Sequence, residues 1–410
     1  MTTPTTQQVT DADGAAGADL REQVLLDRDG LVAIAAGWLA RGGRVVGPVT
    51  GRAVAARAPL GPRTPRVRFA PVTDPELLVL DGFVHATNSA KPLVMPMTEK
   101  LYGYRREGRS VELTPGDPPP APTLLIGARP CDAAAFPILD KVMRWDGADP
   151  GYERRREALT VVTLACTAWD EHCFCTSVGL GPAATRGSDL LLTPDAAGGW
   201  RARVLTDRGA RLTAAASGEP APAVPSDPVP SDPVPDDAGL APSGPPVRVD
   251  VAAATRAMRA SFDQPAWAEA GRQCTGCGAC TYTCPTCHCF DIADEAHGLQ
   301  GARRRNWDSC QFASFTAHAS GHNPRPDQAS RQRQRLRHKF VTYPDLFQDL
   351  LCTGCGNCYR ACPANLGVLQ VLRALAVGSP SGPDDGLDDG PDDGSADGSV
   401  ATGDAAEVRA

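Results

Sequence analysis

Apolar residues in the first half of the chain fall into runs that predict an α/β arrangement. An Ala- and Leu-rich pattern from Leu20 to Leu39 predicts one or two helices. The apolar runs Pro122–Gly127 and Leu159–Ala165 are typical of buried strands, and a predicted helix from about Pro137 to Arg144 lies between them. A strand, a helix and a second strand in this order imply a parallel pair of strands. Shorter stretches bounded by Pro and Gly predict further strands at 67–69 and 77–80.

The second half of the chain has a different pattern. A segment with the repeat Ser-Asp-Pro-Val-Pro has a composition that favours extended polyproline, and predicts a linker or surface insertion. From about Val249 to Val377 the pattern becomes helical and rich in Cys, whereas both ends of the chain lack an apolar period. We therefore predict an α+β protein with several domains. Its parts are a disordered start (1–20), an α/β domain (21–217), a Pro-rich linker or insertion (218–246), a mostly helical domain (249–377) and a disordered acidic tail (378–410).

Composition and charge narrow the class of protein. No apolar run approaches the roughly 18 residues of a membrane helix, and the start of the chain lacks the basic and apolar regions of a secretory signal. We therefore expect a cytoplasmic protein without a membrane span. The net charge is −7, but residues 379–410 hold eight Asp, one Glu and one Arg, which leaves about +1 for the rest. Such a body lacks the broad basic surface of nucleic-acid binding proteins, so nucleic acid is not an expected partner.

Cysteine is the most informative residue type, with 15 in the chain. A reducing cytoplasm keeps thiols free, so their dense spacing predicts metal sites. The pattern C-x2-C-x2-C-x3-C-P occurs twice, in Cys274–Pro285 (the first ferredoxin motif) and in Cys352–Pro363 (the second ferredoxin motif). In bacterial two-cluster ferredoxins, three thiolates of such a run bind one [4Fe–4S] cluster and the fourth binds the other.

This exchange of the fourth cysteine predicts two ligand sets. The first [4Fe–4S] cluster is assigned to Cys274, Cys277, Cys280 and Cys362. The second is assigned to Cys352, Cys355, Cys358 and Cys284. Zinc sites are the alternative, but zinc takes four ligands, commonly from C-x2-C pairs, and fits two four-Cys runs less well. Helical stretches beside the motifs favour a helical ferredoxin type of domain.

Four further cysteines predict a third [4Fe–4S] cluster. Cys131 and Cys166 each come just after a predicted parallel strand, at the sheet edge where open α/β sheets bind ligands, and Cys173 and Cys175 follow in the next loop. We call these four the sheet-edge cysteines. Buried free Cys is the alternative interpretation. Asp132 could be a further ligand or a helix cap.

The three remaining cysteines, Cys287, Cys289 and Cys310, are called the flanking cysteines. Together with His288 they could bind metal, or they could pack against a cluster, and the sequence favours neither. A basic run follows them, formed by Arg331, Arg333, Arg335, Arg337 and Lys339. A solvated helix face is its simplest interpretation, and the alternatives are a docking surface or a screen for anionic clusters.

The predicted ferredoxin-type clusters are coordinatively closed, which indicates an electron conduit rather than a catalytic centre. The segment Gly179–Ala184 has Gly spacing like that of a dinucleotide fingerprint, but Pro182 stands where the helix should open and no good strand precedes it. We therefore expect no flavin or nicotinamide site on this chain. A self-contained flavin-dependent iron–sulfur oxidoreductase is kept as an alternative function.

Together these motifs resemble a known family. The chain is similar to the iron–sulfur β subunit of soluble sulfhydrogenase-type, NAD(P)-linked [NiFe] hydrogenases, and the iron–sulfur subunit of anaerobic sulfite reductase is a near relative. The likeness covers about Lys91 to Val377. It is carried by both ferredoxin motifs and by the segments Gly127–Asp132, Cys166 with Cys173–Cys175, Cys284–Cys289, Arg305–Cys310 and Gly321–Pro326.

The resemblance implies an electron-transfer subunit that is not itself catalytic. Its partners would be a flavoprotein subunit that binds NAD(P)H and the hydrogenase small and large subunits. In the sulfite reductase alternative, the partners would include a sirohaem protein. The proline-rich segment and the acidic tail depart from the family pattern without touching a Cys motif.

Overall fold

Four parallel strands form the centre of a seven-stranded sheet. The strand order is β1 (Gln23–Leu26), β9 (Trp200–Val204), β8 (Leu190–Pro194), β7 (Leu159–Leu164), β6 (Thr123–Ala128), β2 (Arg44–Thr50) and β3 (Val67–Val72). Strands β8, β7, β6 and β2 run parallel, and the outer strands pair antiparallel. Every residue of β6 and β7 is buried, because helices cover both faces of the sheet. The predicted parallel pair is thus confirmed.

The computed structural model describes residues 23–50, 67–216 and 244–377. These ranges belong to one compact unit. The segments expected to be disordered at the two ends, and nearly all of the proline-rich segment, lie outside the described residues. No helix in the described ranges combines the length and apolar character needed to cross a membrane.

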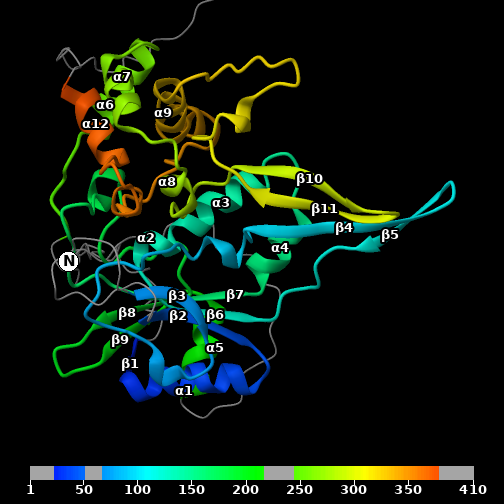
Figure 1. The fold of residues 1–410 in the computed structure, drawn as a ribbon. Coiled ribbons are helices and arrows are strands. Elements are labelled where there is room, and N and C mark those ends of the chain that lie inside the picture. Colours follow the sequence, from blue (N-terminus) through cyan, green and yellow to red (C-terminus); the bar gives the residue numbers. More distant parts are fainter. Residues whose placement is uncertain (1–22, 51–66, 217–243, 378–410) are drawn as a thin grey trace, which may run out of the picture. The chain divides into compact units, whose positions relative to one another are not determined.

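Helices lie on both sides of the seven-stranded sheet (Figure 1). Helices α1 (Arg28–Ala40) and α5 (Asp207–Ala216) pack against each other on one side. On the other side lie α2 (Pro130–Ala133), α3 (Ala135–Met143) and α4 (Pro150–Glu157). The helix predicted from Pro137 to Arg144 is α3, shifted by about one residue at its end and two at its start.

Two local predictions in the first half differ from the structure. Residues 23–26 of the predicted helical stretch form β1, which pairs with β9, so one helix follows rather than two. The strand predicted at 77–80 is absent, although the one at 67–69 is present within β3. Instead Pro75–Leu77 forms a short 3-10 helix, because the Asp74 carboxylate accepts the N–H of Glu76 and Pro75 supplies a helical first position.

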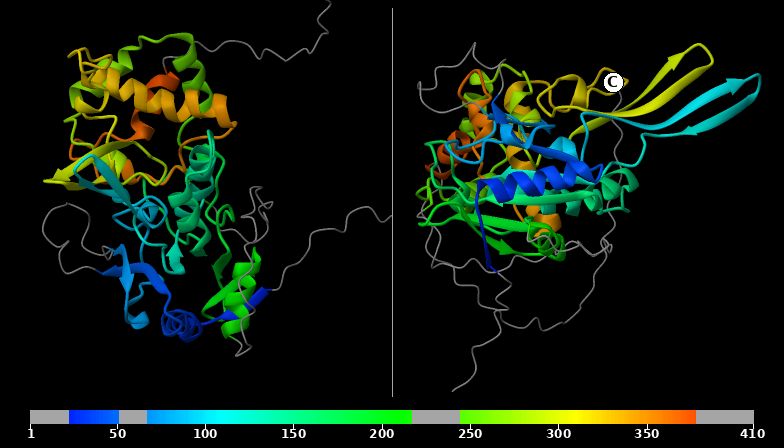
Figure 2. Two further views of the ribbon diagram at one scale, coloured as in Figure 1. Left: turned by 90° about the vertical axis from the view of Figure 1, so that its right-hand side faces the viewer. Right: turned by 90° about the horizontal axis from the view of Figure 1, so that it is seen from below.

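A second sheet joins the two halves of the chain. Its antiparallel order is β10 (Phe290–His297), β11 (Gln300–Trp307), β4 (Thr98–Glu107) and β5 (Ser110–Pro115). Figure 2 shows the β10–β11 and β4–β5 hairpins running side by side. The carboxylate of Glu99 in β4 accepts hydrogen bonds from the buried Arg305 guanidinium of β11. The sequence pattern did not predict this hairpin within the mostly helical part of the chain.

Seven helices lie in the Cys-rich part, separated by loops and the β10–β11 hairpin. They are α6 (Val251–Ala260), α7 (Pro265–Gln273), α8 (Ala279–Tyr282), α9 (Gln328–Arg337), α10 (Tyr343–Phe347), α11 (Asn357–Arg360) and α12 (Val368–Val377). A single π-helical stretch, His338–Thr342, joins α9 to α10. A second hydrophobic core forms between these helices, with Met258, Leu336 and Leu372 at its centre.

Candidate iron–sulfur centres

The two ferredoxin motifs adopt the same local structure. In each, a loop reaches a Gly with φ near +75° that begins a short helix, Gly278 before α8 and Gly356 before α11. This left-handed conformation suits Gly, which has no Cβ. Helices α8 and α11 contact each other, and they carry Cys280 and Cys358. The repeat in the sequence is therefore also a repeat in the structure.

One cavity is lined by all four ligands predicted for the second cluster: Cys284, Cys352, Cys355 and Cys358. Cys284 belongs to the first motif, yet its thiol interacts with the second-motif thiols of Cys352 and Cys355. Burial raises the pKa of Cys352 to about 12. This arrangement fits the predicted exchange of the fourth cysteine.

The ligands predicted for the first cluster do not all line one cavity, unlike those predicted for the second. Cys274, Cys280 and Cys362 border the same hydrophobic core, and the thiols of Cys274 and Cys280 interact. The Cys274 sulfur accepts hydrogen bonds from Gln332 Nε2 at 3.1 Å and from the backbone N–H of Gly276 at 3.4 Å. Cys277 is exposed.

Two buried cations lie beside the cavity of Cys284. Lys339 Nζ lies 3.5 Å from Cys284 Sγ and donates to the Leu351 carbonyl at 2.8 Å. Burial alone would lower the pKa of Lys339, but the neighbouring thiols of Cys284 and Cys287 raise it above its ordinary value. Arg335 also lines the cavity, and its Nε and Nη2 have no hydrogen-bond partner. Buried cations of this kind require anions nearby, which thiolate-bound clusters supply.

The basic run is therefore not a solvated helix face. Arg331, Arg335 and Lys339 are spaced four residues apart on one face, and all three are buried. Arg333 and Arg337 lie between them in the sequence. Arg333 pairs with Asp263 at 3.1 Å, and Arg337 donates to the Met258 carbonyl. Of the alternatives, a screen for anionic clusters fits Arg335 and Lys339.

The sheet-edge cysteines converge as their positions after β6 and β7 predicted. The Cys131 thiol interacts with those of Cys166 and Cys175, and the Cys166 thiol interacts with that of Cys173. His85 Nε2 lies 3.0 Å from Cys131 Sγ. Sequence reasoning missed His85, since it lies in a loop 46 residues before Cys131.

Asp132 caps a helix. Its carboxylate Oδ2 accepts the backbone N–H of Arg129 at 3.1 Å, within a capping box at the start of α2. This contact supports the helix-cap role, while the other carboxylate oxygen, Oδ1, is buried and has no hydrogen-bond partner among the described residues.

The sheet-edge cysteines lie directly against the second ferredoxin motif. Phe174, between Cys173 and Cys175, donates its backbone N–H to the Gly354 carbonyl at 2.9 Å. A Cβ on Gly354 would lie 2.5 Å from the Cys175 Cα, so only Gly allows this approach. Arg360 Nη2 donates to Cys173 Sγ at 3.2 Å, and the Cys131 and Cys355 thiols interact. The third predicted cluster site is thus the neighbour of the second.

The flanking cysteines line one cavity together with His288, and Cys287 also interacts directly with Cys284 of the neighbouring cavity. Cys289 and Cys310 interact directly, and this contact lowers the pKa of Cys310 to about 6 while it raises that of Cys289. All fifteen cysteines are free thiols. No three Cys, His or carboxylate side chains in the described ranges surround a position suited to a single metal ion.

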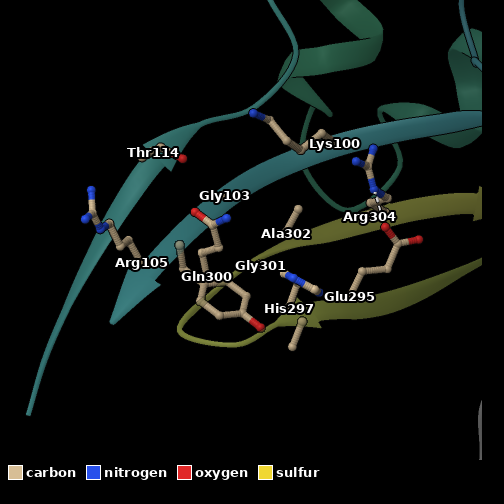
Figure 3. Close-up of a pocket in the computed structure, with 12 residues that line it drawn as sticks. Lys100, Gly103, Arg105, Thr114, Glu295, His297, Gln300, Gly301, Ala302 and Arg304 are labelled. Atoms are coloured by element: carbon tan, nitrogen blue, oxygen red, sulfur yellow. Dashed lines mark hydrogen bonds and ion pairs between the residues drawn. The ribbon is translucent and has the colours of Figure 1, made fainter. Parts of the chain in front are cut away.

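Two other features lie apart from these thiol sets. Figure 3 shows an open pocket on the four-stranded sheet, lined by polar and charged residues such as Lys100, Glu295 and Arg304, and no cysteine lines it. The Gly179–Ala184 segment follows the 3-10 helix Cys175–Val178 rather than a strand. Its geometry is therefore not that of a dinucleotide fingerprint.

The paired motifs, their buried thiols and the buried cations beside them indicate an iron–sulfur protein. Residues 273–366 match the 4Fe-4S dicluster domain family. The chain is also 31% identical over 264 residues to sulfhydrogenase 2 subunit beta of Pyrococcus furiosus. The aligned region covers 62% of this chain and 74% of that protein. The chain belongs to the family of iron–sulfur beta subunits represented by this sulfhydrogenase subunit. No solved structure matches it.

Proposed function

We propose that this chain is the electron-transfer subunit of a cytoplasmic hydrogenase. It would relay electrons between a flavoprotein subunit that binds NAD(P)H and the small and large subunits that hold the catalytic metal. The observation that carries the proposal is the contact between the sheet-edge cysteines and the second ferredoxin motif, because it makes three predicted cluster sites continuous. The relative's name as a sulfhydrogenase subunit favours hydrogen chemistry over sulfite reduction.

The ligand assignments belong to this proposal. Cys274, Cys277, Cys280 and Cys362 would hold one [4Fe–4S] cluster. Cys352, Cys355, Cys358 and Cys284 would hold the second, and the sheet-edge cysteines the third. Bound [4Fe–4S] clusters supply one-electron redox chemistry.

The chain's own residues would keep the relay packed and charge-balanced. Lys339 lies beside Cys284 and carries a positive charge that offsets thiolate charge. The Gly354 loop holds the sheet-edge cysteines against the second motif. Each ligand set supplies four thiols, which leaves no open coordination position for a substrate, so the chain would transfer electrons and its partners would catalyse.

The family resemblance suggests an orientation for the relay, and the order of the sites permits it. The sheet-edge cysteines would face the flavoprotein, and the ferredoxin motifs would face the small subunit.

Anaerobic purification from the native cell tests the assignment to a hydrogenase. We expect a flavoprotein and a nickel-binding large subunit to co-purify with this chain. The isolated chain should accept electrons from dithionite yet reduce neither NAD(P)⁺ nor protons. Co-purification with a sirohaem protein would instead identify a component of a sulfite reductase, and flavin absorbance in the isolated chain would identify a self-contained flavin enzyme.

A further inference from the structure

The cavity of the flanking cysteines lies next to that of Cys284, because Arg335 and Lys339 line both. Cys287, Cys289, Cys310 and His288 contribute the metal-binding side chains of this second cavity. The three cysteines reach it from two segments, the end of the first motif before β10 and the loop after β11. The β10–β11 hairpin thus brings Cys310 back to Cys289, and Asp308 donates its backbone N–H to the Cys289 carbonyl at 3.0 Å.

Three buried cations surround these thiols. Lys91, Arg335 and Lys339 are at most 3% exposed, and no described carboxylate forms an ion pair with any of them. Lys91 Nζ donates to the Cys287 carbonyl at 2.7 Å and lies 3.8 Å from the centre of the Trp307 ring. A buried cation without an anion costs several kcal/mol. Negative charge in this cavity would offset that cost.

The unsatisfied hydrogen-bond donors of Arg335 also indicate that this cavity needs negative charge. Its Nε and Nη2 are buried and have no acceptor among the described residues. The guanidinium interacts most strongly with the thiols of Cys280 and Cys358 in the ferredoxin motifs, and it also interacts with those of Cys287 and Cys284. A single buried guanidinium between two thiol sets is suited to donate to sulfur atoms on both sides.

His288 is oriented as a metal ligand. Its Nδ1 lies 3.0 Å from the Thr286 carbonyl oxygen, and because a carbonyl can only accept, Nδ1 carries the proton. The lone pair of Nε2 is then available. Metal-binding imidazoles commonly donate their other N–H to a backbone carbonyl in this way.

We propose that Cys287, Cys289, Cys310 and the Nε2 of His288 bind a further [4Fe–4S] cluster. On binding, the three thiols lose their protons and form iron–sulfur bonds, and the imidazole donates a lone pair to the fourth iron. A cluster suits the site better than one metal ion, because three of the ligands are consecutive residues that cannot readily surround a single ion. Imidazole ligation raises the reduction potential of an iron–sulfur centre, so this cluster should be reduced before its all-Cys neighbours.

The first test is anaerobic iron and sulfide analysis of the full chain. Changing Cys310→Ser should remove about four iron and four sulfide atoms per chain. The matched control Cys131→Ser should remove a similar amount from the sheet-edge site and leave the flanking site intact. An unchanged iron content in Cys310→Ser would overturn the proposal. So would loss of about one zinc atom in place of iron, or a Cys289–Cys310 disulfide in the anaerobic protein.

The second test is pulsed EPR of the chain during stepwise reduction by dithionite. The first paramagnetic species should show hyperfine coupling to nitrogen. His288→Cys should keep the iron content and remove this coupling, whereas His338→Ala, which changes the other imidazole in the cavity, should keep both. Coupling that survives His288→Cys contradicts the assigned ligand. Neither test depends on which partners the chain has. A negative result would therefore contradict the cluster at the flanking cysteines without contradicting the proposed electron-transfer function.

Discussion

The backbone N–H of Phe174 donates to the carbonyl oxygen of Gly354 over 2.9 Å. One residue lies between two sheet-edge cysteines, and the other lies within the second ferredoxin motif, 180 positions further along the chain. This bond fixes how the α/β part of the chain meets the Cys-rich part. Electron transfer through the chain depends on this contact between the two parts.

Gly354→Ala tests how tightly the two segments must approach. Any Cβ at φ +64° costs about 1 to 2 kcal/mol, and here it would also overlap the Cys175 backbone, which should add about 1 to 3 kcal/mol. Gly298→Ala is the matched control, since Gly298 has φ +61° and open space around its Cβ position. Anaerobic urea unfolding measures both. Equal losses in the two variants would show that the approach is not tight.

Cys284→Ala tests the exchange of ligands between the motifs. We expect damage to the cluster of Cys352, Cys355 and Cys358, because Cys284 lines their cavity. Mössbauer or EPR spectra of the anaerobic variant would measure this. Damage confined to the cluster of Cys274, Cys277 and Cys280 would mean that each motif is self-contained.

Asp349 in the Cys-rich part forms ion pairs with Arg186 and Lys141 in the α/β part. These ion pairs predict how the free energy of unfolding depends on pH. Burial alone would raise the pKa of Asp349, but hydrogen bonds from Arg186 and Lys141 lower it below its ordinary value. A carboxyl group with a lowered folded pKa stabilises the protein above its unfolded pKa of about 3.9, and the effect is lost only as pH falls through the folded pKa. The contribution of Asp349 should therefore be constant between pH 6 and 9.

Asp349→Asn should lower the free energy of unfolding by about 1 to 3 kcal/mol across that range. Asp345→Asn is the control, because Asp345 and its partner Arg259 are both about half exposed, and solvent screening leaves such a pair with little effect on stability. Anaerobic urea unfolding at several pH values measures both. A loss at Asp349 that changes with pH inside this range contradicts the lowered pKa.

Local sequence patterns predicted the features that depend on near neighbours. Apolar runs marked β6 and β7 as a buried parallel pair, and this pairing placed Cys131 beside Cys166. The two ferredoxin motifs and the segments around the other cysteines carried the resemblance to the family. These predictions succeed because a buried strand and a ligand loop each need a particular pattern within a few residues.

Features that depend on distant contacts were not predictable. The hairpin β10–β11 pairs with β4, and its Arg305 meets Glu99 across 206 positions, which no local pattern records. Spacing of four residues placed Arg335 and Lys339 on one helix face, but a basic face toward solvent and one toward buried thiols have the same pattern. The surroundings of the helix, and not its sequence, distinguish the two.

The most direct test of the proposed relay uses the complex purified anaerobically from the native cell, with Cys131→Ala in this chain. Reduction of NAD(P)⁺ by H₂ should be abolished, while H₂ oxidation by an artificial dye that takes electrons upstream should be retained. Loss of both activities in a complex that stays assembled would contradict the proposed order of sites. Retention of both would show that the sheet-edge cysteines are not on the electron path.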